Sequence, residues 1–207
     1  MVGDFDLAFL NKVRAVWPNT IYANTAITYN AIYSGGITPD TEGKMKFPLL
    51  NVYRMEFKPN PTQTLGARLS GYNDDFIDGN KIISTRYITT NLAYQINIFA
   101  KTLEELDQLT NDILIMFSLD PNLEVKQYSR NKEYSRTEDY QVTYLNGPVE
   151  QTSTDNDDRI YTYAVVYQIK NAKLMHFKEV KLSQELEIEV SQEGLDGELV
   201  NTETIEI

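Results

Sequence analysis

The stretch from Tyr94 to Phe117 constrains the fold most, because its periodicity changes from that of a strand to that of a helix. Its first residues alternate between apolar and mostly polar side chains, which predicts a strand with one apolar face. The apolar positions are Tyr94, Ile96 and Ile98, and those between them are Gln95, Asn97 and Phe99.

Apolar residues then recur every three or four positions, which predicts an amphipathic helix over about 102–117. Thr102 and Glu105 have the spacing of a capping box, in which each side chain binds a free backbone N–H of the first turn. Pro121 follows the expected end of the helix. A strand that leads into such a helix must bury both apolar faces together, which predicts a helix folded back on a sheet.

A second helix is predicted over residues 4–17, with Asp4 as its cap and Pro18 after its end. Phe5, Phe9, Val13 and Trp17 form one apolar stripe along it. Strands are expected at 20–34, 46–57, 123–128, 140–145 and 159–169. Residues 81–89 form a further strand or the approach to Tyr94, and residues 173–180 continue the sheet or pair elsewhere. The 159–169 strand is apolar on both faces and is therefore expected to lie inside the sheet. Asn146-Gly147-Pro148 is typical of a turn.

These elements predict an α+β fold with a mixed, mainly antiparallel sheet that carries the 102–117 helix and the N-terminal helix. We expect one domain over 1–179, with long loops at 58–80 and 129–139, and a strand-forming arm over 180–207. The alternative for the arm is a frayed acidic tail. Because a lone hairpin is barely stable in water, an ordered arm needs the body or a neighbouring subunit as a partner.

The two loops and the arm are the expected contact surfaces. In the 58–80 loop the contact residues are predicted to be Tyr72 and Phe76. Asp74, Asp75 and Asp78 do not match the spacing of a calcium loop, so we expect a solvated or subunit-ordered loop and no metal site. The 129–139 loop offers Arg130, Lys132, Tyr134 and Arg136, and the arm offers Leu186, Ile188 and Val190.

Charge is distributed unevenly along the chain. Its net charge is −11, and the segment 179–207 carries −8, with nine acidic residues and one Lys. The remaining 178 residues carry only −3, so neither part has the basic surface of a general nucleic-acid binder.

No catalytic motif is present in the sequence. The chain has no Cys, which excludes disulfides and thiolate chemistry, and its single His, His176, lies in an apparent strand. We expect no catalytic residues and no cofactor. No apolar run approaches the length of a membrane span, and Asp4 and Asp6 precede the apolar residues where a signal peptide has Lys or Arg. The chain is therefore expected to be soluble and made in the cytoplasm.

The sequence resembles the tail-terminator and neck proteins of tailed bacteriophages. The segments YQINIFAKTLEELDQLTNDILIMF and RIYTYAVVYQI carry the resemblance, together with FPLLNVYRMEF near Phe47. The resemblance covers about half of the chain and includes no diagnostic motif, because strand-to-helix units of this kind occur in many folds.

This resemblance implies a non-enzymatic virion protein, assembled in the host cytoplasm, that forms a ring, commonly a hexamer. Such a ring caps the tail tube, joins it to the head and contacts other tail or neck proteins, while DNA passes through its lumen without specific binding. Alternatives are another tail component, such as a sheath-contacting or baseplate protein, or a Tyr-lined carbohydrate or small-molecule binding module. An enzyme with paired carboxylates, such as Asp74 and Asp75, has no supporting motif.

Overall fold

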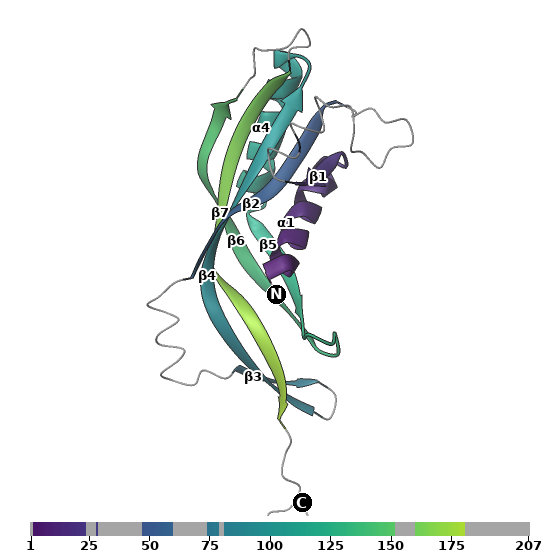
Figure 1. The fold of residues 1–207 in the computed structure, drawn as a ribbon, viewed down its shortest axis with the longest axis vertical. Helices are drawn as coiled ribbons and strands as arrows, with labels where there is room; N and C mark the ends of the chain where they lie inside the picture. Colours follow the sequence, from purple (N-terminus) through teal and green to yellow (C-terminus); the bar gives the residue numbers. More distant parts are fainter. Residues whose placement is uncertain are drawn as a thin grey trace, which may run out of the picture. The chain divides into compact units, whose positions relative to one another are not determined.

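The computed structural model describes residues 2–23, 28, 47–59, 74–78, 81–151 and 160–180, apart from the side chains of 74–76, 78 and 180. These residues form two helices, α1 (Val2–Val16) and α4 (Leu103–Leu119), and seven strands (Figure 1). The strands are β1 (Thr20–Tyr22), β2 (Leu49–Pro59), β3 (Asp74–Asp78), β4 (Lys81–Ala100), β5 (Asn122–Tyr128), β6 (Ser135–Glu150) and β7 (Tyr161–Val180).

Six of these strands follow the order β1-β2-β4-β7-β6-β5, and β3 pairs with the first residues of β4. β1 pairs with β2 in parallel, whereas β2–β4, β3–β4, β5–β6 and β6–β7 are antiparallel. The predicted α+β class with a mixed sheet is therefore confirmed. β7 lies between β4 and β6, which confirms the internal position predicted for the 159–169 strand.

The chain divides into two compact units. The first comprises Met1–Tyr72 and Arg86–Phe177, and the second comprises Asn73–Thr85 and Lys178–Ile207. This division differs from the expected domain over 1–179, because residues 73–85 join the C-terminal segment. In the second unit, Asp74–Asp78 pair with Lys81–Thr85, Ile83 is fully buried, and Lys81 Nζ lies 3.1 Å from Glu179 Oε2.

Both helices pack on the same face of the sheet in the first unit. The Phe9 ring of α1 stacks on Tyr94 of β4, with centroids 4.4 Å apart, and on Phe117 of α4 at 5.4 Å. Phe117 in turn lies 4.2 Å from the Tyr167 ring of β7. These four rings are at most 4 % exposed and form the centre of one apolar core.

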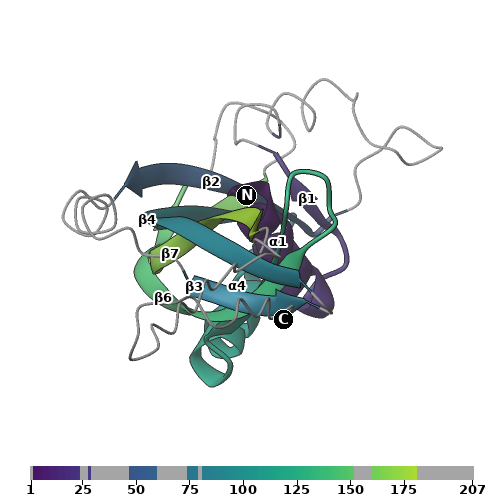
Figure 2. The same ribbon diagram turned by 90° about the horizontal axis from the view of Figure 1, so that it is seen from below.

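α1 also connects strands from the two ends of the sheet. It contacts β1 and β2 on one side and β5 on the other, and the strands between them curl around it (Figure 2). Arg54 Nη1 of β2 donates to both Asp6 carboxylate oxygens, at 2.9 and 2.8 Å. Lys12 Nζ donates to Asp120 and to the Asn122 carbonyl, and this contact lowers the pKa of Asp120. Polar contacts therefore hold α1 to β2 on one side and to the start of β5 on the other.

α4 begins at the predicted cap. The Thr102 hydroxyl oxygen accepts a hydrogen bond of 3.3 Å from the Glu105 backbone N–H. Leu106, Leu109, Ile113 and Phe117 are buried along one side of the helix. Asp4 does not cap α1, because that helix begins at Val2 and Asp4 lies in its first turn.

Some loop and turn predictions are wrong. Residues 74–78 of the predicted 58–80 loop form β3. The segment 129–139, predicted as a loop or a hairpin tip, is the tip of the β5–β6 hairpin as far as Tyr134, and β6 begins at Ser135. Asn146-Gly147-Pro148 makes no turn, because β6 continues through it with two shifts of register against β7. Gly147 has φ +118, and a Cβ there would lie 2.6 Å from the Ala164 carbonyl oxygen. The close approach of β7 therefore requires glycine at a bulge.

The predicted polar face of the 94–100 strand is also buried. Gln95 and Asn97 are 6 % and 0 % exposed, and the Gln95 amide donates to the Asn97 side-chain oxygen at 2.5 Å. This pairing allows polar side chains to be buried.

Candidate partner-contact surfaces

The β5–β6 hairpin ends in a tight turn at Ser129–Tyr134, called the basic tip below. The Ser129 N–H donates to the Tyr134 carbonyl at 2.8 Å, and the Lys132 N–H donates to the Ser129 carbonyl at 2.9 Å. The Ser129 hydroxyl oxygen also accepts from the Tyr134 N–H at 3.0 Å. Lys132 has φ 61, in the left-handed region, which completes the reversal of the chain. The tip is thus fixed by its own hydrogen bonds.

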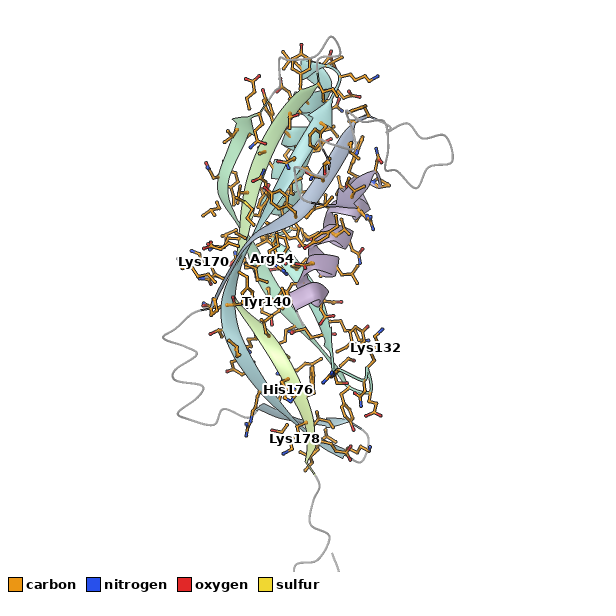
Figure 3. The ribbon with its side chains drawn as sticks, viewed as in Figure 1. Arg54, Lys132, Tyr140, Lys170, His176 and Lys178 are labelled. Carbon is orange, nitrogen blue, oxygen red and sulfur yellow. The ribbon has the colours of Figure 1, made fainter. Side chains whose placement is uncertain are left out.

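Arg130 and Lys132 are exposed on this turn, as predicted for contact residues of the 129–139 segment. Figure 3 shows Lys132 at the end of the hairpin. Neither side chain has an ion pair among the described residues, whereas Glu133 accepts from the Asn131 amide. Lys126 of β5 is also exposed and lies over the Tyr128 ring, 5.4 Å from its centroid. The tip therefore presents cationic groups on a rigid support.

Tyr134, the last residue of the tip, and Arg136 of β6 are less exposed than Arg130 and Lys132. Tyr134 is only 9 % exposed, so little of its ring can reach a partner. Arg136 Nη2 lies 3.3 Å from Glu138 Oε1, which also lies 3.4 Å from Lys173 Nζ. The Tyr140 hydroxyl donates to Glu138 at 2.9 Å, and burial, followed by the Glu138 charge, raises the pKa of Tyr140. The contact role of Tyr134 and Arg136 stays a prediction.

The remaining predicted contact residues fall outside the described part. Tyr72, Leu186, Ile188 and Val190 are not among the described residues, and neither is the 181–207 part of the arm. Phe76 lies in β3 opposite Ile83, but its side chain is not described.

A second surface, which sequence reasoning missed, is a cleft between α4 and the neighbouring ends of β6 and β7. Its volume is about 440 Å³, and it is called the acidic cleft below. Leu114, Pro148 and Tyr163 provide apolar surface, and Asp107 and Glu150 provide carboxylates. Burial, then the charges of Asp107 and Glu150, raise the pKa of Tyr163. Thr110 and Asn111 complete the lining.

The helix beside this cleft is strongly acidic. α4 contains Glu104, Glu105, Asp107 and Asp112 and no Lys or Arg. The sequence showed this polar side of the helix, but the β6 and β7 residues that complete the cleft are distant in the chain. Only the tertiary structure brings Asp107 and Glu150 together.

β6 also has three exposed apolar side chains where its register against β7 shifts, Tyr144, Leu145 and Val149, called the apolar β6 segment below. Their exposed fractions are 51 %, 53 % and 46 %. An exposed apolar side chain of this kind gains free energy when another chain covers it.

No group of three or more His, Cys, Asp or Glu in the described part of the chain is placed to hold a metal ion. His176 is exposed on β7. Among the described helices, none is long and apolar enough to cross a membrane.

A comparison of the sequence with protein-family models and with curated proteins finds no match.

Proposed function

We propose that this chain is a non-enzymatic structural protein of a bacteriophage virion. In this proposal it is a tail-terminator or neck component whose copies, six in number, form a ring that caps the tail tube and joins it to the head. The resemblance of residues 94–117 and 159–169 supports this function, and the α+β fold with two helices on one sheet face is compatible with it.

The observation that carries the proposal is the apolar β6 segment. Tyr144, Leu145 and Val149 are each about half exposed within one unit. Burial of such side chains against another chain contributes about 25 cal/mol for each Å² of apolar area removed from water. A protein that assembles provides that burial, whereas a solitary chain leaves the segment in water.

The proposed ring has a lumen through which DNA passes without specific binding. The net charge of −11 supports this part of the proposal, since acidic surfaces repel phosphates. Its other partners are tail and neck proteins, and its place is the virion, after assembly in the host cytoplasm. Another tail component, such as a sheath-contacting or baseplate protein, has the same need for contact surfaces.

The test is the mass of the full chain in solution, measured by light scattering at several concentrations, with negative-stain electron microscopy of the largest species. We expect a closed ring with a central opening. Changing Tyr144, Leu145 and Val149 together to Ser should reduce assembly. The matched control changes Ile115 and Leu119 of α4, which are 54 % and 81 % exposed, to Ser. A monomer at every concentration would contradict self-assembly.

The acidic cleft favours a second candidate, a module that binds a carbohydrate or small molecule. Its volume of about 440 Å³ suits a small ligand. However, Tyr163 is its one tyrosine, and Tyr94, Tyr140 and Tyr167 are buried in the core. Part of the Tyr-rich composition therefore reflects packing in the core. Saturation-transfer NMR with a glycan panel would test this candidate. If a glycan binds in the cleft, Tyr163→Ala should abolish its saturation-transfer signal.

A further inference from the structure

We propose that the basic tip of one copy docks into the acidic cleft of the next copy, so that the ring is held by a head-to-tail contact. This inference rests on the proposed function and specifies the contact that makes the ring. The occupant of the cleft is a second copy of this chain, and the groups that meet are Arg130 and Lys132 on one side and Asp107 and Glu150 on the other.

Charge complementarity supports this pairing. The tip presents two exposed cations, Arg130 and Lys132, and one exposed carboxylate, Glu133, which accepts a hydrogen bond from Asn131. Lys126 of β5 is a further exposed cation of the same hairpin. The cleft has two carboxylates, and α4, which forms one wall, has four acidic and no basic residues. An arginine or lysine that enters the cleft gains charged hydrogen-bond partners, and its aliphatic part packs on Leu114, Pro148 and Tyr163.

The two surfaces cannot meet within one chain. Both belong to the first unit, and both are attached to β6, which starts beside the tip at Ser135 and reaches the cleft at Pro148 and Glu150. Thirteen residue steps of extended strand span roughly 40 Å. The basic tip can therefore dock only into the acidic cleft of another copy of the chain.

Such a contact has a defined symmetry. Two different surfaces of the same chain meet, so the interface is heterologous, and repeated contacts generate a closed ring or an open filament. Stable hydrogen bonds within the tip reduce the ordering cost of docking, because the turn is already formed. The apolar β6 segment lies on the same strand as the cleft wall and can extend the interface.

The experiment uses charge reversal in the full chain. The tip variant is Arg130→Glu with Lys132→Glu, and the cleft variant is Asp107→Lys with Glu150→Lys. All four side chains are exposed, so folding should be preserved, which circular dichroism and the thermal midpoint verify. The matched control is Lys58→Glu with Lys170→Glu, two exposed lysines of the same unit away from both surfaces. Assembly is measured by sedimentation velocity at several concentrations and salt strengths.

We expect the tip and cleft variants each to raise the dissociation constant of assembly by at least about tenfold, since like charges then face each other. The control should assemble as the wild type does. A one-to-one mixture of the tip and cleft variants should assemble again, because each acidic tip then faces a basic cleft and each basic tip faces an acidic cleft. In the mixture the two variants alternate around the ring, so only a ring with an even number of subunits can close. A chain that carries all four reversals should form a ring of any size.

Each other outcome would overturn the pairing. If neither the tip variant nor the cleft variant changes assembly, the proposal of a ring stands and the proposed contact is rejected. Loss with the tip variant alone would assign a different acidic surface to the tip, and loss with the cleft variant alone would assign a different occupant to the cleft. If the mixture of the tip and cleft variants does not assemble, the tip and the cleft do not contact each other directly. A wild-type chain that stays monomeric would reject the ring and this contact together.

Discussion

α1 and α4 pack on the same sheet face but are held in different ways. Both supply an aromatic ring to the central cluster, Phe9 from α1 and Phe117 from α4. α1 is additionally fastened by Asp6 to Arg54 and by Lys12 to Asp120. α4 has a hydrogen-bonded cap at Thr102 and leaves an acidic side exposed beside the cleft.

The difference indicates a division of roles between the helices. α1 connects β2 with the start of β5, so its polar residues act within the fold. The acidic residues of α4 have few such contacts, and their surface is available for a partner. Substitutions in α1 should therefore reduce stability, whereas substitutions on the acidic side of α4 should reduce binding.

The largest expected effect is on the ring cluster that the two helices share. Phe9→Ala should lower the free energy of unfolding by about 3–5 kcal/mol, because it leaves a cavity among Tyr94, Phe117 and Tyr167. Urea unfolding measures this change. Leu7→Ala on the same helix, at a position that is 57 % exposed, should change it by less than about 0.5 kcal/mol. Equal losses at both positions would contradict the assigned core.

The next effect concerns the fastening of α1 to β2. Arg54→Met should destabilise the fold by about 1–3 kcal/mol, because the largely buried Asp6 carboxylate loses its cation. Arg54→Lys retains a charge and should cost less. Chemical unfolding of both variants gives the comparison, and an unchanged stability in Arg54→Met would show that α1 does not depend on this ion pair.

The free energy of unfolding should depend on pH, because two tyrosines lie near Asp6. The Tyr94 hydroxyl donates to Asp6 at 2.8 Å, and burial, then the charge of Asp6, raises the pKa of Tyr94 above its usual value of 10.0. Burial and Asp6 likewise raise the pKa of Tyr22 to about 12. The folded state therefore keeps protons that the unfolded state releases. The contribution of the two protonated tyrosines to the free energy of unfolding is complete below pH 10. It is lost as the pH rises through 10 and beyond 12.

Tyr94→Phe should make this alkaline loss shallower by up to about 1.4 kcal/mol for each pH unit above 10. Unfolding free energies at pH 8, 10 and 11 provide the slope. Identical slopes for Tyr94→Phe and the wild type would contradict the retained proton.

The smallest effect concerns the cap of α4. Thr102→Ala should cost about 1 kcal/mol, since the Glu105 N–H loses its acceptor, and Thr102→Ser should cost little. Thermal unfolding distinguishes the two variants. A loss in Thr102→Ala as large as that in Phe9→Ala would indicate that α4 depends on its cap more than on packing.

The sequence by itself determined the elements with a clear period. The change of period after Ala100 and the spacing of Thr102 from Glu105 placed the start of α4, and the apolar stripe of Phe5, Phe9 and Val13 placed α1. These signals are local, because the backbone hydrogen bonds and the apolar face of a helix are encoded within a few neighbouring residues. The exposed cations of the basic tip were also predicted.

Only the tertiary structure decided how distant segments meet. A turn signal at Asn146-Gly147-Pro148 became a bulge, because β7 continues alongside β6 on both sides of it. Tyr134 became buried, although its charged neighbours suggested a solvated loop. The acidic cleft joins Asp107, Glu150 and Tyr163 from three elements. Side-chain burial and proximity depend on the pairing of strands far apart in the sequence, and no local pattern specifies that pairing.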